Sequence, residues 1–299
     1  MDLDRPNFFS GPYIDRRAEA REDDGWLEDA LVDPQAHFLL ACGTGQLVHT
    51  GAAPRIAFLS ASHPAVTEAD PSRAVLLGWF RERRCVLVEL EPGIPPELPS
   101  GTSFEELRPL SPLLAGDEAG LLAYARALAI WRGRQRFCGA CGAPTEPTRA
   151  GHCLRCSRAS CALEFFPRID PAIIVLVTDG ERALLGRQPR WPPGRYSTIA
   201  GFVEPGESLE DAVAREVMEE TAVEVTGTRY GSSQPWPFPS SLMVGFRASA
   251  RPRSAVRVTG ELEHARWFTR EEIRAGAVGL PPAHSISRRL IDEWLPAGG

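Results

Sequence analysis

The stretch that decides the fold runs from Gly201 to Val223 and reads GFVEPGESLEDAVAREVMEETAV. Pro205 and Gly206 form a turn pair. Ser208, followed three residues later by Asp211, is typical of a helix start because each side chain can satisfy a free backbone N–H of the other. No further Gly or Pro interrupts the stretch. The sequence therefore predicts a loop that leads into a helix.

One face of this predicted helix changes from apolar to acidic along its length. At about 100° per residue, three apolar side chains point in the same direction as three carboxylates one turn later. These residues are Leu209, Ala212, Val213, Glu216, Glu219 and Glu220. A glutamate run is usually a solvated surface, but these carboxylates continue a core-facing stripe, where their repulsion is costly. Divalent cations such as Mg²⁺ bind carboxylate oxygens, so the pattern predicts a metal site.

The spacing of the stretch resembles the Nudix box of hydrolases that act on nucleoside diphosphates linked to another group. The matching positions are Gly201, Glu207 and the run Arg215-Glu216-Val217-x-Glu219-Glu220. The family pattern has Gly where this chain has Ala222. In a left-handed helix end, Ala costs about 1 kcal/mol relative to Gly. The departure concerns the loop after the helix and leaves the carboxylates intact.

Length and composition place the chain among globular proteins. Its 299 residues suffice for about two domains of ~150 residues. The net charge of −6 gives no overall attraction to nucleic acid or to an anionic membrane. The first residues lack a signal-peptide pattern, and no apolar run approaches the ~20 residues of a membrane helix. We therefore expect a cytoplasmic protein with no membrane partner.

Five of the seven cysteines lie between Cys138 and Cys161, which predicts metal thiolates rather than disulfides. Cys138 and Cys141 form a C-x₂-C knuckle that grips one Zn²⁺, and a structural zinc needs two more ligands. Local geometry slightly favours Cys153 and Cys156, a second C-x₂-C. The pair Cys156 and Cys161, a C-x₄-C, is the alternative.

The segment after these cysteines, Phe166-Pro-Arg-Ile-Asp-Pro171, resembles the [YF]-P-R-x-D-P segment of the Nudix relatives. Those relatives carry the C-x₄-C arrangement just before it. The resemblance therefore implies Cys138, Cys141, Cys156 and Cys161 as zinc ligands, with Cys153 as a spare cysteine.

Three proline residues, at positions 235, 237 and 239, stiffen the segment Ser233–Ser240, which reads SQPWPFPS. Proline removes backbone donors, so neither a helix nor a central strand can form there. A stiff loop that presents Trp236 and Phe238 loses little entropy when these rings stack on a ligand. A polyproline-like docking peptide is the alternative. The segment resembles the SQPWPFPxS signature of the NADH pyrophosphatase (NudC-type) branch of the Nudix family.

The remaining pattern predicts an α+β protein. Before the cysteines, short β-like runs lie at 37–42, 46–49, 55–60, 74–80 and 85–90, and later runs at 172–177, 182–185, 241–250 and 255–259. A final amphipathic helix is expected over Ser285–Leu295. We expect a small β-rich domain with a linker helix over 1–132, a zinc ribbon over 133–166, and a hydrolase domain over 167–299. For the last, the resemblance implies the Nudix α/β/α sandwich with a mixed sheet.

The resemblance also assigns roles to individual positions. Mg²⁺ or Mn²⁺ would be held by Glu216, Glu219, Glu220, Glu261 and the backbone carbonyl of Ala200. The catalytic carboxylates would be Glu216, Glu219 and Glu220, with Glu219 or Glu220 as candidate bases. Substrate contacts would come from Phe166, Phe202, Gln234, Trp236, Phe238, Ser241 and Ser287. Arg108 is a further candidate because it can reach an anionic ligand. Arg215 is expected to orient the carboxylates by ion pairing.

The function implied is metal-dependent hydrolysis of the pyrophosphate bond of NADH or NAD⁺ by a homodimer, which gives (reduced) nicotinamide mononucleotide and AMP. A second enzymatic reading is removal of an NAD cap from RNA 5′ ends. It is motivated by the arginines around the predicted ribbon, namely Arg132, Arg134, Arg136, Arg149, Arg155 and Arg158. The non-enzymatic alternative is a zinc-ribbon RNA-binding protein, against which the complete glutamate set argues.

Overall fold

The computed structural model describes residues 6–23, 25–91, 93 and 97–295. The outermost residues of the first and last predicted domains, 1–5 and 296–299, lie outside this part. The chain divides into two compact units. The C-terminal unit consists of the residues up to Phe8 together with Ile169–Trp236 and the chain from Ser241 onward. The N-terminal unit consists of Phe9–Arg168 and Pro237–Ser240.

The C-terminal unit is built on one mixed sheet with the strand order β13-β14-β10-β11-β15, and β12 pairs with β10. β10 runs parallel to β14, and the other neighbouring strands are antiparallel. The strands are β10 (Asp170–Thr178), β11 (Arg182–Arg187), β12 (Ile199–Phe202), β13 (Val225–Trp236), β14 (Ser241–Ala250) and β15 (His264–Thr269). The helices are α5 (Leu209–Thr221), α6 (Arg270–Arg274) and α7 (Ile286–Trp294).

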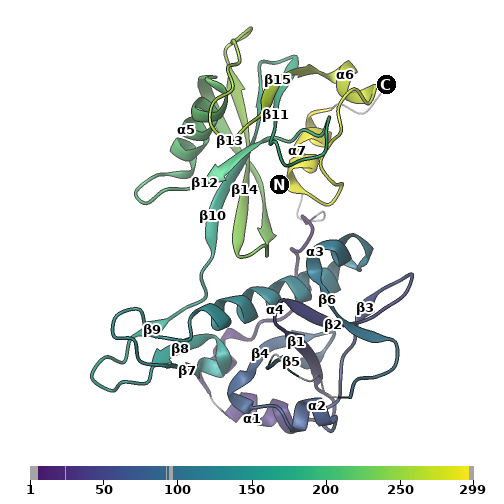
Figure 1. Cartoon of the computed structure of the whole chain (residues 1–299), viewed down its shortest axis with the longest axis vertical. Helices are drawn as coiled ribbons and strands as arrows, with labels where there is room; N and C mark the ends of the chain where they lie inside the picture. The colour runs from purple at the N-terminus through teal and green to yellow at the C-terminus, as the bar shows by residue number, and fades with distance from the viewer. Residues whose placement is uncertain (1–5, 24, 92, 94–96, 296–299) are drawn as a thin grey trace. The chain divides into compact units, whose positions relative to one another are not determined.

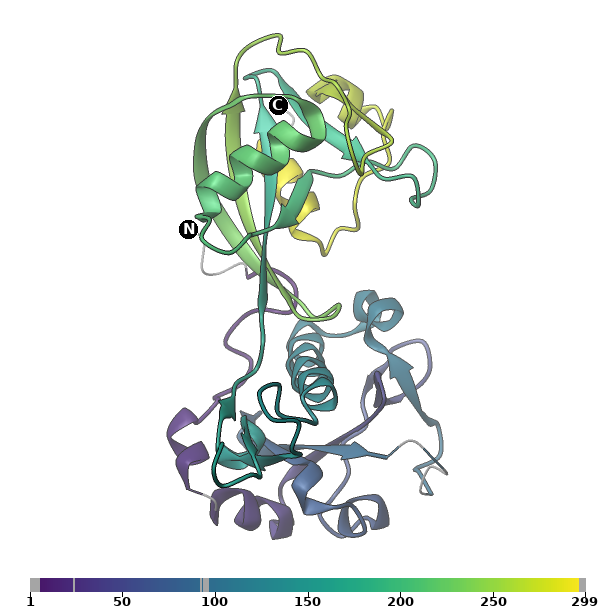
Figure 2. The same cartoon turned by 60° about the vertical axis from the view of Figure 1, so that its left-hand side comes forward.

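Side chains alternate across β10, so this strand contributes to a core on each face of the sheet. Ile173 shares one core with Val213 of α5, and Ile174 shares the other with Leu290 of α7. Figures 1 and 2 show α5 on one face of the sheet and α7 on the opposite face. This arrangement is the expected α/β/α sandwich, and the predicted terminal helix lies within it.

Two expectations for the segments beside the sheet need correction. The proline-rich segment is a loop only over 237–240, because residues up to Trp236 belong to β13 and pair with β14. β13 is an edge strand, a position that tolerates proline. The predicted strand at 255–259 is wrong, since Ala255–Thr259 joins no ladder. Its backbone N–H groups instead reach the end of α5, through Arg257 to Thr221 and Thr259 to Glu220.

The N-terminal unit contains a sheet with the order β3-β2-β1-β5-β4, and β6 pairs with β2. The strands are β1 (His37–Cys42), β2 (Gly45–His49), β3 (Arg55–Ile56), β4 (Ala74–Phe80), β5 (Arg83–Leu90) and β6 (Thr102–Glu106). The helices and 3₁₀ turns around it are η1 (Ala18–Glu22), α1 (Gly25–Val32), α2 (Pro64–Thr67), η2 (Pro71–Arg73), α3 (Leu107–Leu110), η3 (Ser111–Leu113) and α4 (Gly116–Arg134). The predicted β runs are therefore present, the third of them shortened to two residues.

A small three-stranded sheet, in the order β7-β8-β9, carries the cysteine cluster in the same unit. Its elements are β7 (Thr145–Thr148), η4 (Arg149–Gly151), β8 (Cys153–Cys156) and β9 (Glu164–Phe165). His152 packs on the larger sheet, where its buried Nε2 lies 2.8 Å from the carbonyl oxygen of Leu76. With three sheets and both helices and strands in each unit, the α+β class is confirmed. In the described part of the chain, every helix is too short or too polar to cross a bilayer.

Candidate active site

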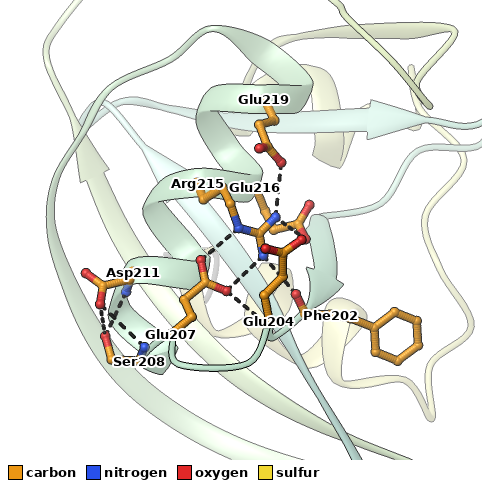
Figure 3. Close-up of polar contacts among 8 residues, drawn as sticks. All are labelled: Phe202, Glu204, Glu207, Ser208, Asp211, Arg215, Glu216 and Glu219. Carbon is orange, nitrogen blue, oxygen red and sulfur yellow. Dashed lines mark hydrogen bonds and ion pairs between the residues drawn. The ribbon is translucent and has the colours of Figure 1, made fainter.

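The loop and helix predicted from the sequence are present, and the helix start has the expected cap. Ser208 and Asp211 form a capping box at the N-terminus of α5 (Figure 3). The Asp211 backbone N–H donates to Ser208 Oγ at 3.1 Å, and the Ser208 N–H donates to Asp211 Oδ2 at 3.4 Å. These bonds satisfy donors that a helix leaves free in its first turn. The cap thereby fixes the residue at which the helix begins, and with it the direction in which each later glutamate projects.

Glu216 reaches back from α5 to β12. A Cβ atom added to Gly201 would stand 1.9 Å from both Cδ and Oε1 of Glu216, so the carboxylate lies directly over the glycine. Gly201 pairs with Ile173 in the ladder between β12 and β10. The glycine therefore lets the carboxylate approach the backbone of the strand.

Arg215 connects the loop to the carboxylates and uses all of its guanidinium nitrogens (Figure 3). It donates from Nε and Nη2 to Glu207 at 2.7 and 3.0 Å. Nη1 donates to Glu216 at 2.9 Å and to Glu219 at 3.0 Å, and Nη2 donates to the Phe202 carbonyl at 2.9 Å. The guanidinium lowers the pKa of Glu207. Arg215 thus orients the acidic loop and helix by ion pairing, as the sequence led us to expect.

Glu220 is a buried carboxylate that receives no hydrogen bond and no ion pair from any described residue. Its pKa is raised to about 7, mainly by burial and additionally by the charges of Glu216, Glu261 and Glu219, in that order. Burial is also the largest cause that raises the pKa of Glu216, and Glu261 contributes there too. Glu261 therefore lies within electrostatic reach of both helix carboxylates, although it follows Glu220 by 41 positions and Glu216 by 45.

These four glutamates fit a divalent cation by their chemistry. A buried, unpartnered carboxylate beside other carboxylates is costly without a compensating charge. Oxygen ligands of this kind suit hard cations such as Mg²⁺. No three of the four carboxylates bring ligand oxygens within 4.8 Å of one another in this structure. Arg215 draws two of them, Glu216 and Glu219, toward itself.

The cysteine cluster is a second candidate metal centre. The Sγ atoms of Cys138, Cys141, Cys156 and Cys161 all lie within 4.8 Å of one another, and it is the only such group in the described chain. The separation is 3.8 Å for Cys138–Cys161 and 3.4 Å for Cys141–Cys156. Sulfurs bound tetrahedrally at about 2.3 Å stand about 3.8 Å apart. Cys153 is fully buried outside this group.

Among the expected substrate contacts, the C-terminal unit holds Phe202, Gln234, Trp236, Ser241 and Ser287. Phe202 is 60% exposed, and its ring points away from Arg215 (Figure 3). Gln234 is fully buried and its amide is used internally. It accepts from the Ile286 N–H at 2.8 Å and donates to the His284 carbonyl at 2.8 Å.

Ser287 is also buried, and its side chain is used internally. Its Oγ accepts from the Thr198 N–H at 3.2 Å and lies 2.8 Å from Ser197 Oγ. Ser241 is buried at the start of β14, opposite Trp236 in the ladder. The side chains of Gln234 and Ser287 therefore bond the start of α7 to neighbouring segments of the same unit.

The other expected contacts, Phe166, Arg108 and Phe238, belong to the N-terminal unit. Phe166 is exposed beside Arg149. Arg108 lies over the Phe238 ring at 4.1 Å, and both residues line a cavity of about 670 Å³. Arg126 of α4, which the sequence analysis did not single out, donates from Nε to the Pro237 carbonyl at 3.1 Å. The signal available in the sequence was a single charged residue in the otherwise uncharged run 119–131.

Comparison with known proteins agrees with this architecture. Residues 168–294 match the NUDIX domain, residues 35–131 match the NADH pyrophosphatase-like rudimentary NUDIX domain, and residues 134–166 match the NADH pyrophosphatase zinc ribbon domain.

Individual relatives agree as well. The NAD-capped RNA hydrolase NudC of Mycobacterium bovis (strain BCG / Pasteur 1173P2) is 40% identical over 90% of this chain and 87% of its own. NudC of Stutzerimonas stutzeri (strain A1501) is 42% identical over 73% of this chain and 76% of its own. The NAD-capped RNA hydrolase NUDT12 of Homo sapiens is 33% identical over 97% of this chain and 73% of its own. The chain therefore belongs to the Nudix hydrolases, in the branch that carries an NADH pyrophosphatase-like domain and a zinc ribbon ahead of its catalytic domain.

Proposed function

We propose that the protein hydrolyses the pyrophosphate bond of NADH and NAD⁺, giving (reduced) nicotinamide mononucleotide and AMP. The observation that carries this proposal is Glu220, a buried carboxylate without a donor, with Glu216 and Glu261 close enough to raise its pKa. Such a group is stabilised by a cation, and a pyrophosphate needs a cation to offset its own negative charge.

The residues that would hold Mg²⁺ or Mn²⁺ are Glu216, Glu219, Glu220, Glu261 and the backbone carbonyl of Ala200. When bound, the cation would neutralise charge on the pyrophosphate oxygens and make a water more acidic. Arg215 orients Glu216 and Glu219 through its ion pairs. Glu219 and Glu220 are the candidate bases.

Aromatic side chains are proposed to bind the rings of the dinucleotide. Phe202 and Phe166 are both more than half exposed, so stacking would remove their surfaces from water. Trp236, Phe238 and the backbone of the segment from Gln234 to Ser241 are the other proposed contacts. Ser287 is proposed to contribute its backbone, because its hydroxyl is already engaged. Arg108 is proposed to meet an anionic part of the substrate.

Zn²⁺ is proposed to be held by Cys138, Cys141, Cys156 and Cys161, whose sulfurs are already grouped at suitable separations. Gly142, with φ 71°, closes the first knuckle, where its N–H donates to the Cys138 carbonyl at 2.8 Å. The metal would be structural, because a segment of this size has little apolar core of its own.

The direct test is to mix the zinc-loaded full-length protein with NADH and Mn²⁺ and to identify the products by mass spectrometry. We expect AMP and reduced nicotinamide mononucleotide. Glu220→Gln should lower kcat/KM by at least ~100-fold, the scale of a lost catalytic group, while zinc content stays unchanged. Absence of AMP from NADH, with hydrolysis of another dinucleotide, would reject NADH as substrate.

A second candidate substrate is the NAD cap of an RNA 5′ end. The matched relatives are named NAD-capped RNA hydrolases, and exposed arginines at 134, 136, 155 and 158 accompany the ribbon. Phosphate contacts make binding salt-dependent. We expect kcat/KM for capped RNA to exceed that for NADH at low salt and to fall more steeply as salt rises. Equal salt dependence for both substrates would count against an RNA contact.

We also propose that the protein acts as a homodimer in the cytoplasm. The dimer is what the NudC-type resemblance implies. The reducing compartment is supported by seven free cysteines, four of them grouped as a metal site. Light scattering on the purified full-length protein tests the dimer, and a monomer at micromolar concentration would reject it.

A further inference from the structure

The segment between β14 and β15 carries Glu261 to the helix carboxylates, and its path is held in place. It joins no ladder, but Val256 and Val258 pack against the same core as α5. The Trp267 indole N–H donates to the Ser254 carbonyl at 2.8 Å at the start of this path. The segment 254–259 is therefore held against the core and is not a free loop, and we call it the strap.

The strap is bonded to the last turn of α5. The Arg257 N–H donates to the Thr221 carbonyl at 3.0 Å, and the Thr259 N–H donates to the Glu220 carbonyl at 3.3 Å. The hydroxyl of Thr259 donates to the carbonyl oxygen of Glu219. These carbonyls have no partner within the helix, because a helix leaves its last four acceptors free. Thr259 thus bonds the backbone of two of the box glutamates.

The chain on the other side of Glu261 is anchored as well. Gly260 turns the backbone with φ 68°, and Leu262 packs over Gly186, where an added Cβ would stand 2.7 Å from Leu262 Cδ1. The Glu263 N–H then donates to the Arg187 carbonyl at 2.9 Å. Glu261 therefore projects from a short turn fixed at both ends.

We infer that Thr259 is a positioning residue for the cation site. Its N–H and hydroxyl bond the backbone of Glu220 and Glu219, and two residues later the same strap delivers Glu261 to those carboxylates. The bond from the Thr259 hydroxyl fixes the position of the strap relative to α5. Without it, Glu261 would no longer be held at its distance from the other proposed ligands. The inference rests on the proposed metal role of Glu261.

The test compares two Thr→Val substitutions in the zinc-loaded full-length protein. Thr259→Val keeps the shape and the backbone N–H but removes the hydroxyl bond. Thr226→Val is the matched control, because its Oγ1 makes the same kind of exposed bond, to the Ser249 carbonyl at 3.1 Å. The dissociation constant for Mn²⁺ is measured by electron paramagnetic resonance without substrate, and the unfolding midpoint is measured alongside.

We expect Thr259→Val to weaken Mn²⁺ binding by about tenfold, the lower end for loss of a group that orients a ligand. Thr226→Val should bind Mn²⁺ as the unaltered protein does. Thr259→Ser keeps a hydroxyl and should also bind Mn²⁺ with unaltered affinity. The two valine variants should unfold at similar temperatures. Unchanged Mn²⁺ affinity in Thr259→Val, or equal weakening in Thr226→Val, overturns the inference.

Glu261→Gln distinguishes this failure from failure of the proposed metal site. If Glu261→Gln weakens Mn²⁺ binding and Thr259→Val does not, the positioning role alone is wrong. If Glu261→Gln binds Mn²⁺ as the unaltered protein does, Glu261 is not a ligand, and the proposed ligand set fails together with the inference built on it.

Discussion

The carboxylate of Glu216 fills the space that any side chain on Gly201 would need. The two residues come from a strand and a helix, and the clash distance of 1.9 Å applies to both Cδ and Oε1. A shift of a few tenths of an ångström cannot relieve such an overlap, so an added methyl group must displace the carboxylate or the strand.

Gly201→Ala is accordingly expected to damage the cation site more than the fold. Overpacking costs about 1–3 kcal/mol, a loss that a folded domain can survive. Displacing Glu216 should weaken Mn²⁺ binding by at least about tenfold and lower kcat/KM with it. Gly227→Ala is the control, because a Cβ there meets nothing within 4 Å. Titration with Mn²⁺ and urea unfolding separate the two effects, and unchanged Mn²⁺ affinity in Gly201→Ala would contradict this account.

Ala222 makes the end of α5 a site where a glycine should stabilise the protein. Its φ of 56° and ψ of 24° are left-handed, and its N–H donates to the Met218 carbonyl. Ala222→Gly removes the strain of a Cβ in this region, which exceeds the entropic cost of glycine, and should raise the free energy of unfolding by about 0.5–1 kcal/mol.

Ala214 is exposed in the middle of the same helix, and replacing it by glycine should change the free energy of unfolding in the opposite direction. Ala214→Gly should lower the free energy of unfolding by about 1 kcal/mol, because ordinary helical backbone gains nothing from glycine. Urea titrations of both variants measure the difference. A destabilised Ala222→Gly protein would show that the left-handed end carries no strain.

Local signals predicted the parts of the site that depend on residues near one another in sequence. The capping box of Ser208 and Asp211, the acidic face of α5 and the turn at Gly142 follow from spacings of three to four residues. The alternation of Ile173 and Ile174 between two cores explains why 172–177 reads as a continuous apolar run: both faces of β10 are covered.

What sequence patterns missed depends on distant partners. Ala255–Thr259 has the composition of a strand, but its N–H groups meet the end of α5 instead of a neighbouring strand. β6 lies in a proline-rich stretch and pairs with β2, more than 50 residues earlier. The sequence pattern gave no sign that the Gln234 amide bonds the backbone of His284 and Ile286, about 50 residues away.

The zinc ligands can be separated by single cysteine substitutions. Cys161→Ser removes one of four grouped sulfurs and should lower bound zinc from about one per chain to well below it, with loss of the ribbon's folded structure. Cys153→Ser changes a buried thiol outside the group and should keep the metal. Elemental analysis after dialysis counts the zinc. If Cys161→Ser keeps its zinc and Cys153→Ser loses it, Cys153 rather than Cys161 is the fourth zinc ligand.

The pH dependence of stability tests whether the ionised Glu220 carboxylate destabilises the folded protein when no divalent cation is added. Its pKa is about 7 in the folded chain, raised by burial from an ordinary value of 4.5. Below pH 4.5 the group is protonated in both states. Between 4.5 and 7 only the folded state keeps the proton, so stability falls as pH rises through this window, by on the order of 3 kcal/mol at most.

Glu220→Gln should remove that slope and leave the protein more stable than the unaltered chain at pH 8 without added Mg²⁺ or Mn²⁺. Adding Mn²⁺ should reverse the order, because a ligand that binds only the folded state stabilises it and the amide binds it less well. Urea unfolding from pH 5 to 8, with and without Mn²⁺, measures both effects. Glu210→Gln, which removes an exposed carboxylate from the first turn of the same helix, is the control. Parallel pH profiles for the unaltered protein and Glu220→Gln would show that this carboxylate is not strained, and the main support for the proposed cation site would be lost.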